Sequence, residues 1–587
     1  MDKYQLLIKT LDAIIIEAQN IESRISNKFQ TTTAELINQS RSRALIHLFL
    51  RTRFGLIDLA SAESCVTEGD GDGGLDAYFI DETNKIVYLV QSKFRTVPEN
   101  FEQRSVDGYE LFKMHLGEIT RGEPTDAKGK SFNGKVQGLQ RKIGEITNIG
   151  QYKYVLVFLG NIPQNLDPNS LNTVSGSVCE KVEIINGKDT YNHLLLPYIQ
   201  SDFYNKENFI LEIQVSQGQT NRINYSVEIN GQHININMAF IPTLEVAKMM
   251  KEYKNSLLKF NPRCYVGIRN DSVNSKIHSS ISNTKSNEFS LLNNGVTIIC
   301  SDFQYTERNA RRGIATLQVS NPQIVNGGQT AVTLANILTS EDERIFDNKE
   351  VLVKFISLNE DQSPDQIALI EKISEATNNQ TPVALSDRKS NDPILTDLQN
   401  YLFENHGLLL ERKNGEFFDA IQNGIVGRSD IIPKDLCLRL CFVMHGRVSE
   451  ARSFSKEQLF KEFPIRSTMF SSIYGLIMTQ KLIDSQVQRS RDSDVRYRVL
   501  EYGNGLRYGK YSIIYVVYEM SKIYDTSLDE LLDDIKQRWP GFETTVQNKE
   551  SNRGYFYDGF NYDNYYKGKT VNEDLKEYFE LNRLDDV

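Results

Sequence analysis

Two β-patterned runs joined by a short polar turn constrain this fold more than any other feature of the chain. The runs are LDAYFID at 75–81 and IVYLVQSKF at 86–94, and the turn between them is ETNK. Both runs are rich in aromatic and β-branched residues, which favour strands, so the spacing predicts a β-hairpin. A glycine-rich turn that carries three carboxylates, EGDGDGG at 68–74, leads into this hairpin.

Polar side chains end the second strand of the predicted hairpin. Gln91 and Lys93 are two residues apart, so they project from the same face of a strand, and Asp76 on the first strand can face them. Oxygen ligands suit a hard divalent cation, and a lysine can meet the attacking water or the phosphate. We therefore predict a site of metal-dependent phosphodiester cleavage, with Asp76 and Gln91 as ligands of Mg²⁺ or Mn²⁺ and Lys93 as the catalytic cation.

A purely structural hairpin is the alternative interpretation. Aspartate and glycine are common in turns, so Asp72 and Asp76 could serve only to shape the backbone while Lys93 is solvated. This alternative does not account for a Gln/Lys pair at the end of the apolar run IVYLV.

The spacing of these residues resembles the PD-(D/E)xK nuclease superfamily, and most closely its Mrr-like restriction endonucleases. The matching residues run from Gly71 to Asp76 (GDGGLD) and then Gln91-Ser92-Lys93, within a resemblance that covers roughly 30–165. The resemblance implies that Asp76 is the principal metal ligand, that Gln91 takes the place of the usual Asp or Glu, and that Lys93 is the catalytic lysine. It also implies an acidic residue from the preceding helix, for which Glu35 is our choice, although Glu63 and Glu68 fall nearer the hairpin.

The segments around the hairpin complete a mixed α/β pattern. Apolar residues at helical spacing predict a helix over 3–25 and another over about 33–53, and YKYVLVFLG at 152–160 is apolar on both faces, which is typical of a buried central strand. We expect an N-terminal helix at 1–30, followed by a nuclease domain at 31–220 with a restriction-endonuclease-like mixed sheet and flanking helices.

Asparagine-rich stretches punctuate the middle of the chain. They are FNPRCYVG at 260–267, LLNNGVTIIC at 291–300, NPQIVNGGQTAVTLANIL at 321–338 and EATNNQTPV at 375–383. The third predicts a strand, a glycine turn and a helix that starts near Thr330, where free N–H groups form a ready anion site. Asn326, Gly327, Gly328, Gln329 and Thr330 are therefore candidate ligand contacts. The competing interpretation is that these asparagines cap helices and shape turns.

These stretches resemble the abortive infection phage resistance (AIPR) family. The motifs that carry the resemblance are Asn293-Asn294-Gly295, the NGGQT turn at 326–330, and Thr377-Asn378-Asn379-Gln380, in this order along the chain. The resemblance implies a role in bacterial anti-phage defence and supplies no catalytic mechanism. We place a central α/β AIPR domain at 221–500 and a mostly helical C-terminal segment with a tyrosine-rich tail at 501–587.

The composition and net charge of the chain limit the class of protein and the kind of partner that we expect. The chain has 587 residues, of which 40% are hydrophobic and 25% charged, so we expect several globular domains. Its net charge of −10 means that any nucleic-acid site must be a local basic patch, for which RNARR at 308–312 and the residues around Lys135 are candidates. Six cysteines without a CxxC pair, and no apolar run long enough to span a bilayer, predict a cytoplasmic protein without a membrane partner.

A further group of cysteine and histidine residues is not expected to form a metal site. Cys437, Cys441 and His445 recur every four residues along one predicted helix face. The first and last are about 12 Å apart on such a helix, too far to share one ion. A buried apolar face is the better interpretation.

Together these observations predict an anti-phage effector. In this account a Mg²⁺-dependent PD-(D/E)xK-type endonuclease cleaves DNA, and the AIPR region regulates it. The expected partners are DNA, a phage-derived or defence-system protein as trigger, and further copies of the chain. The alternative is a catalytically degenerate module that binds nucleic acid or protein within a defence system, because the amide of Gln91 is a weaker ligand than a carboxylate.

Overall fold

A computed structural model describes most of the chain. The described residues are 2–82, 84–106, 114–163, 178–203, 210–216, 223–229, 232–261, 273–282, 288–306, 314–358, 364–378, 385–492 and 503–581. The chain divides into two compact units, of which one comprises residues 1–381 with 414–430 and the other 382–413 with 431–587. This division does not coincide with the domain limits predicted at 220 and 500, because the segment 382–413 leaves the first unit and the chain then returns to it.

The first unit begins with a four-stranded mixed sheet in the order β1-β2-β3-β4. Its strands are β1 (Ala77–Asp81), β2 (Ile86–Ser92), β3 (Lys153–Leu159) and β4 (Lys181–Ile185). The pair β1/β2 is antiparallel, whereas β2/β3 and β3/β4 are parallel. The predicted hairpin is therefore confirmed, and the two-sided apolar run at 152–160 is a central strand with five consecutive buried residues.

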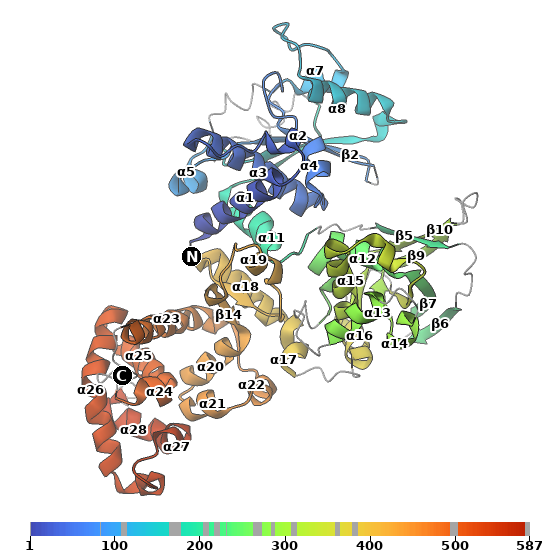
Figure 1. Cartoon of the computed structure of the whole chain (residues 1–587). Helices are drawn as coiled ribbons and strands as arrows, with labels where there is room; N and C mark the ends of the chain where they lie inside the picture. Colours follow the sequence, from blue (N-terminus) through green and yellow to red (C-terminus); the bar gives the residue numbers. More distant parts are fainter. Residues whose placement is uncertain are drawn as a thin grey trace. The chain divides into compact units, whose positions relative to one another are not determined.

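Helices cover this sheet (Figure 1). Apolar residues of α7 (Leu116–Arg121) and α8 (Gly134–Glu145) share a core with Tyr78 and Leu89 of the hairpin. On the alternate hairpin positions, Phe79 stacks on Phe54 of α3 (Ala34–Phe54), with ring centroids 4.1 Å apart. The helix α1 (Lys3–Gln19) packs against α3. Shorter helices are α2 (Ser23–Ser26), α4 (Leu59–Ser64), α5 (Pro98–Gln103), α10 (Gly187–Asp189) and α11 (Leu196–Ile199).

The rest of the first unit is built on two further sheets. The larger has five strands in the order β11-β8-β12-β7-β6, and the smaller has three in the order β5-β10-β9. The larger contains β6 (Ile223–Ile229), β7 (Gln232–Pro242), β8 (Val296–Cys300), β11 (Gln323–Asn326) and β12 (Glu350–Ser357). The smaller contains β5 (Ile210–Ser216), β9 (Asp302–Thr306) and β10 (Ile314–Ser320). The stretch NGVTIICSDFQYT at 294–306 is β-patterned throughout, and we would expect one strand from its residues, but it forms two strands that separate at Ser301 and join different sheets.

Helices pack on the larger sheet. The helix α12 (Thr243–Tyr253) packs on α15 (Gly328–Ser340), and both share a core with β8 and β12. The other helices of this part of the chain are α13 (Val273–Ser282), α14 (Phe289–Leu292), α16 (Pro364–Asn378) and α19 (Phe418–Gln422). The predicted strand, glycine turn and helix at 321–338 are present, but the helix begins at Gly328 rather than near Thr330.

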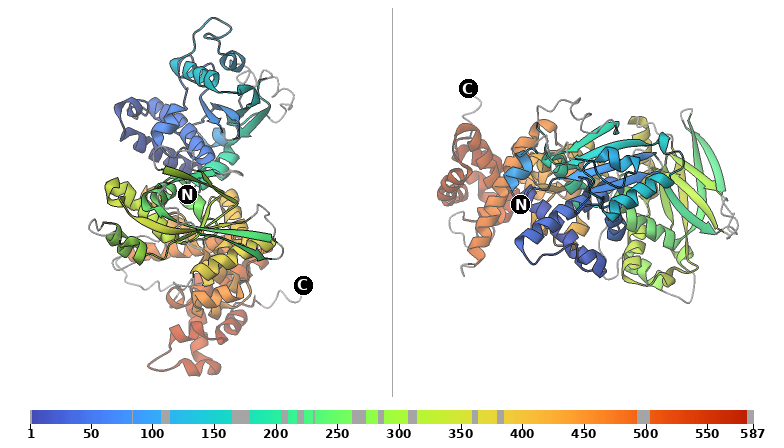
Figure 2. Two further views of the ribbon diagram at one scale, coloured as in Figure 1. Left: turned by 90° about the vertical axis from the view of Figure 1, so that its right-hand side faces the viewer. Right: turned by 90° about the horizontal axis from the view of Figure 1, so that it is seen from above.

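The second unit is mostly helical, and it includes the C-terminal segment at 501–587 that was predicted to be helical (Figures 1 and 2). Its longest helices are α18 (Pro393–His406), α20 (Lys434–Met444), α23 (Phe470–Asp492), α25 (Lys510–Ile523) and α26 (Leu528–Asn548). Two tyrosines of the tail, Tyr565 and Tyr566, are fully buried in the core of this unit. The tyrosine-rich tail therefore packs into its own unit through these side chains.

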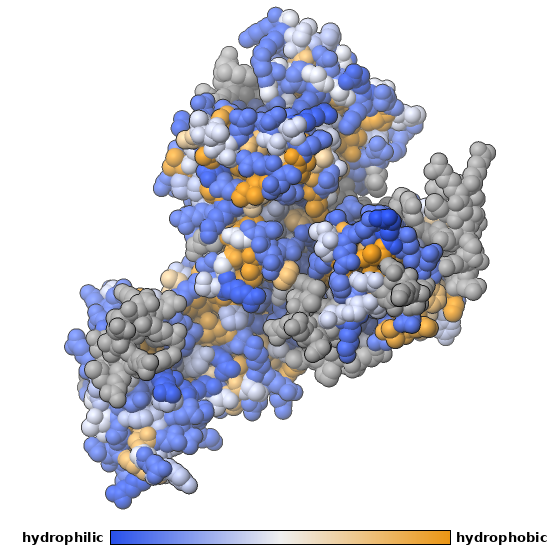
Figure 3. Space-filling view, in the orientation of Figure 1, coloured by the Kyte–Doolittle hydropathy of each residue, from blue (hydrophilic) through white to orange (hydrophobic). Residues whose placement is uncertain are grey.

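The molecular surface visible in Figure 3 is largely hydrophilic, with apolar residues in small groups. Among the described helices, none has the length and apolar character that crossing a bilayer requires.

Candidate active site

The glycine-rich turn before β1 is closed by its own aspartate. The carboxylate of Asp72 accepts hydrogen bonds from the backbone N–H groups of Gly69 (3.0 Å) and Gly74 (2.8 Å). Asp72 thus shapes the turn, as the structural interpretation of the hairpin expects of this residue. Gly73 has a φ of +67°, and a Cβ there would lie 2.7 Å from the ring of Phe132. The absence of a side chain at Gly73 therefore leaves room for the ring of Phe132.

Asp76 follows this turn and is half-buried beside the end of β2. Its Oδ2 accepts a hydrogen bond of 2.7 Å from the backbone N–H of Ser92. Burial raises the pKa of the Asp76 carboxyl to about 7. The Ser92 hydrogen bond and the charge of Lys93 oppose the rise, and the negative charges of Glu68 and Asp72 add to it. Three acidic groups therefore act on one another here, and a bound cation would relieve their repulsion.

Gln91 lies across the hairpin from Asp76 and is buried. Its side chain is 4% exposed, and its Oε1 has no hydrogen-bond partner among the described residues. An unpaired buried carbonyl oxygen costs about 1–3 kcal/mol. Such an atom calls for an explanation, and a ligand that this oxygen would bind is one.

Lys93 follows directly after β2. Its backbone N–H donates to the carbonyl of Leu159 on β3 at 2.8 Å, which fixes the start of this side chain. The side chain is partly exposed, and its ammonium forms no ion pair within the described part of the chain. The charge of Lys93 acts on Asp76, so the structure brings Asp76, Gln91 and Lys93 to one end of the hairpin.

The acid expected from the preceding helix, Glu35, is not the acid that acts on Asp76 in the structure. Glu35 lies in the exposed first turn of α3, where its carboxylate accepts a 3.4 Å hydrogen bond from Gln39. Two carboxylates act on Asp76 through their charge, and the larger effect comes from Glu68, in the loop between α4 and β1, ahead of Asp72 in the glycine turn. Burial raises the pKa of Glu68 as well. Glu68, eight residues before Asp76, therefore replaces Glu35 as the candidate third acid.

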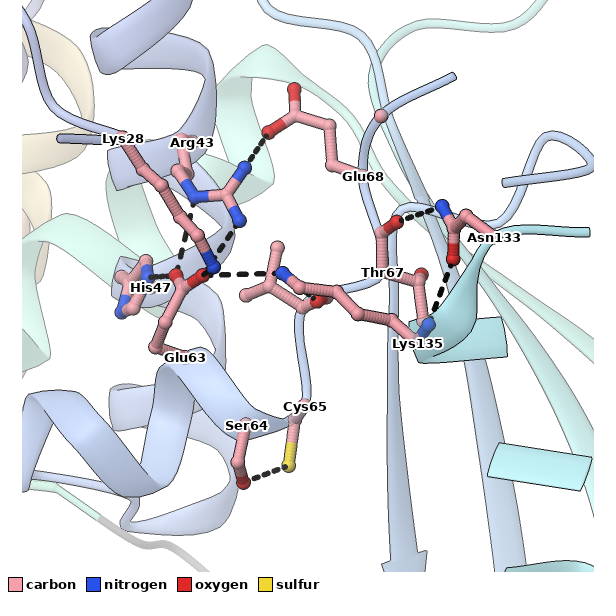
Figure 4. Close-up of polar contacts among 12 residues, drawn as sticks. Lys28, Arg43, His47, Glu63, Ser64, Cys65, Thr67, Glu68, Asn133 and Lys135 are labelled. Atoms are coloured by element: carbon pink, nitrogen blue, oxygen red, sulfur yellow. Dashed lines mark hydrogen bonds and ion pairs between the residues drawn. The ribbon is translucent and has the colours of Figure 1, made fainter. Parts of the chain in front are cut away.

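Arg43 on α3 fixes Glu68 through a network that residue patterns did not reveal (Figure 4). Its Nη1 donates to Glu68 Oε2 at 2.8 Å. Its Nη2 and Nε donate to the two oxygens of Glu63 on α4, at 2.7 and 3.2 Å. The one signal in the sequence is that Arg43 and His47 share helical spacing with the inward-facing residues of α3. The helix thus supplies a cation that positions carboxylates of the following loop.

Glu63 is the centre of this network. Besides Arg43, its carboxylate is bound by Lys28 (2.7 Å), by His47 Nε2 (3.0 Å) and by Lys135 (3.2 Å). Although burial opposes it, these bonds hold the pKa of Glu63 well below its usual range. Burial lowers the pKa of His47, so a neutral His47 donates to Glu63 near neutral pH. Burial also lowers the pKa of Lys135 to about 8.

The residues around Asp76 are compatible with a hard divalent cation. The atoms of Asp76, Glu68 and Gln91 that could bind a metal are all oxygens, which suits Mg²⁺ or Mn²⁺, and the Oε1 of Gln91 is unpaired. Within the described residues, no group of three or more His, Cys, Asp or Glu side chains is arranged to hold a metal ion. Two carboxylates and an amide therefore form the candidate set, and Mg²⁺ commonly completes its shell with water.

The asparagine motifs of the central region bind one another. Asn293 Nδ2 donates to Thr330 Oγ1 (3.2 Å), and Asn326 Nδ2 donates to the carbonyl of Thr377 (3.0 Å). Gly327 has a φ of +80°, and a Cβ on Gly328 would lie 2.9 Å from Asn261 Nδ2. These contacts favour the capping and packing interpretation for the turn at 326–330. Asn379, Gln380 and the cluster at 308–312 lie outside the described residues.

The cysteine and histidine set on α20 behaves as a buried helix face. Cys437 and Cys441 are fully buried, and His445 at the end of the helix has its Nδ1 2.7 Å from the carbonyl of Cys441.

A comparison with protein families adds an independent observation. The model of the family described as AIPR protein matches residues 258–559, a little more than half of the chain. The chain belongs to the AIPR family. Membership in the AIPR family indicates a role in abortive-infection defence against phage. The AIPR match extends past residue 500 into the second unit, and neither the curated proteins nor the solved structures yielded a match.

Proposed function

We propose that this AIPR protein is a defence effector whose N-terminal domain hydrolyses phosphodiester bonds of DNA with a divalent cation, most suitably Mg²⁺. The observation that carries the proposal is the buried, unpaired Oε1 of Gln91 beside Asp76. Each neighbouring group has a use in this chemistry. A purely structural interpretation of the hairpin leaves this amide oxygen buried without a partner.

The chain's own residues have distinct roles in this proposal. The Ser92 amide fixes Asp76 Oδ2 and leaves the other carboxylate oxygen for a cation, together with Gln91 Oε1 and Glu68. A divalent cation held there supplies positive charge to the scissile phosphate and to the attacking water. Lys93 stabilises negative charge that develops on the phosphate. Because Asp76 has a pKa near 7, it must lose its proton before it can serve as a ligand.

Lys93→Ala in the full chain tests this proposal. The purified wild-type protein is incubated with supercoiled plasmid and Mg²⁺, alongside Lys93→Ala and Lys153→Ala. Lys153 is an exposed lysine paired with Glu180 at the start of β3, so its loss controls for charge. We expect cleavage to fall by about 100-fold or more in Lys93→Ala and to be unchanged in Lys153→Ala. Wild-type cleavage by a clean preparation of Lys93→Ala would refute the assignment.

One observation favours the second candidate, a degenerate module that only binds nucleic acid. Within the described residues three acidic, histidine or cysteine side chains do not converge as a metal site, and Gln91 stands where a carboxylate is usual in the superfamily that the sequence resembles. This candidate predicts DNA binding without cleavage in Mg²⁺ or in Mn²⁺, and no gain of cleavage in Gln91→Glu.

Regulation by the AIPR region is also part of the proposal. Asp419, inside the family match, accepts hydrogen bonds from Ser201 (2.9 Å) and Lys254 (2.6 Å). Ser201 lies just after α11, where the N-terminal region ends. Through the bond to Ser201, a residue of the AIPR region contacts the end of the N-terminal region directly. We expect Asp419→Asn to raise toxicity on expression, and Lys93→Ala to abolish that rise. A folded Asp419→Asn protein with unchanged toxicity would contradict this role.

A further inference from the structure

A small cleft opens at the carboxyl ends of the parallel strands β2, β3 and β4. It is lined by residues that follow these strands, among them Lys93, Gly160 and Gly187. Arg95 and Arg104 line it as well, and its volume is about 10 Å³. No carboxylate is among the residues that line it. In sheets with parallel strands, ligands often bind outside the carboxyl ends of the strands.

Hydrogen bonds and aromatic packing fix the backbone around this cleft. Asn161 Nδ2 donates to the carbonyl of Phe101 (2.8 Å), and Asn161 Oδ1 accepts from the N–H of Gly187 (2.9 Å). Phe101 of α5 packs into the core against Tyr191, with ring centroids 5.6 Å apart. Arg104 follows α5 directly, so this packing fixes the point from which its side chain extends. Tyr4 donates to the backbone carbonyl of Arg95 (3.0 Å), which leaves the guanidinium unaffected.

The three cations of this cleft differ from those basic groups of the domain that are bound to carboxylates. Lys28, Arg43 and Lys135 all bind Glu63, and Arg51 binds Glu17. Within the described part of the chain, the cations of the cleft (Lys93, Arg95 and Arg104) form no ion pair. Arg104 is exposed, and the other two are partly exposed. Their charge is therefore not neutralised by the protein itself.

We propose that Lys93, Arg95 and Arg104 form a binding site for backbone phosphates of DNA, next to the proposed cleavage site. The proposal deepens the proposed function and rests on it for the identity of the ligand. Lys93 joins the two sites, since it both lines the cleft and follows Gln91 by two residues. A cleft of this volume is too small for a nucleoside. It therefore offers contacts to phosphate oxygens and no reading of base sequence.

A local basic site would allow a chain with a negative net charge to bind DNA. A chain with a net charge of −10 is repelled by DNA at long range. Lys135, one of the basic groups that the sequence offered for this role, is bound to Glu63. The cleft lies at the end of the sheet that also carries Asp76, so phosphates held there bring a neighbouring phosphodiester bond to the site.

The test measures binding without cleavage. A short fluorescein-labelled DNA duplex is titrated with the full chain in EDTA, and fluorescence anisotropy is followed over a series of KCl concentrations. We expect Arg95→Gln and Arg104→Gln each to weaken binding several-fold and to reduce the slope of log K against log[salt] by about one. Arg95→Lys should retain the slope, because the charge is kept.

Arg121→Gln is the matched control, since Arg121 is an exposed arginine of the same domain that is already paired with Glu123 at 2.8 Å. It should bind like the wild type. If Arg95→Gln and Arg104→Gln also bind with the wild-type slope, or if the wild type does not bind the duplex, the inference is overturned. Arg104 is exposed, so Arg104→Gln decides the matter even if Arg95→Gln is unstable. The assay does not need catalysis. Reduced slopes in a protein that does not cleave DNA would uphold the inference and refute the proposed nuclease. Wild-type slopes in a protein that does cleave DNA would overturn the inference and leave the proposed nuclease in place.

Discussion

Arg43 Nη1 donates a 2.8 Å hydrogen bond to Glu68 Oε2 while the other side of the same guanidinium binds Glu63. One cation on α3 thereby positions two carboxylates that are five residues apart in the sequence. Glu68 is one of the charges that act on Asp76, so this pair links the helix to the candidate metal site.

Loss of this cation should destabilise the N-terminal domain strongly. Arg43→Met leaves the buried Glu63 without its bidentate partner, and breaking such a pair costs about 3–5 kcal/mol. Arg41→Met is the control on the same helix, because Arg41 makes a similar bidentate pair with Asp12 at a more exposed site, where the cost is about 1 kcal/mol or less. Hydrogen exchange of the amides of α3 measures both local free energies of opening. Equal losses in the two variants would contradict the role of the Arg43 network.

The raised pKa of Asp76 gives the protein a specific dependence on pH. Its pKa is about 7 in the fold and about 4 in an unfolded chain. Between these values the folded state holds the proton more tightly, so the stability of the metal-free domain should fall as pH rises from about 4 to about 7 and then level off. Asp76→Asn should flatten this profile, as followed by melting temperature in EDTA. A wild-type profile in Asp76→Asn would show that another group titrates.

Gln91→Glu should exchange stability for metal dependence. The substitution places a second carboxylate in a buried position beside Asp76, where repulsion and burial destabilise it without a cation. We expect the melting temperature to fall in EDTA and to recover with Mg²⁺, with cleavage preserved or raised, because a carboxylate is the stronger ligand. A melting temperature that Mg²⁺ leaves unchanged, together with lost cleavage, would remove Gln91 from the ligand set.

Gly328→Val tests whether the asparagine motifs are a scaffold. A Cβ at this first residue of α15 would lie 2.9 Å from Asn261 Nδ2 and 3.2 Å from Leu258 Cδ2, so we expect a large drop in melting temperature with loss of defence in cells. Gly134→Val is the control, since Gly134 is the first residue of α8 and has open space around it. Lost defence at an unchanged melting temperature would instead favour a ligand contact at this turn.

The local elements around the candidate active site could be predicted from the sequence, because they depend on short-range patterns. Two runs of aromatic and β-branched residues around a polar turn predicted the hairpin, and two-sided hydrophobicity predicted the central strand β3. The third acid could not be predicted in this way. Helical periodicity shows which face of α3 is buried, but not that Arg43 on that face reaches Glu63 and Glu68 in the following loop. The resemblance directed attention to a helix-borne carboxylate, whereas Glu35 lies in an exposed turn.

Long-range organisation was also beyond the sequence patterns. The break at Ser301 sends β8 and β9 to different sheets, although the stretch reads as one strand. The basic cleft joins residues after three strands and one helix, so no run of charges marks Arg95 and Arg104 in the sequence. Such groupings follow from sheet order, which single-sequence patterns do not fix.

The central claim is tested most directly by Mg²⁺-dependent cleavage of plasmid DNA in wild type, Asp76→Asn and Asp70→Asn. Asp70 is an exposed carboxylate of the same glycine turn that pairs with Lys130, so Asp70→Asn makes the same chemical change outside the site. The account predicts cleavage by the wild type and Asp70→Asn in Mg²⁺, none in EDTA, and none by a folded Asp76→Asn. Cleavage by Asp76→Asn at the wild-type rate, or no cleavage by the wild type in Mg²⁺ or Mn²⁺, would contradict it.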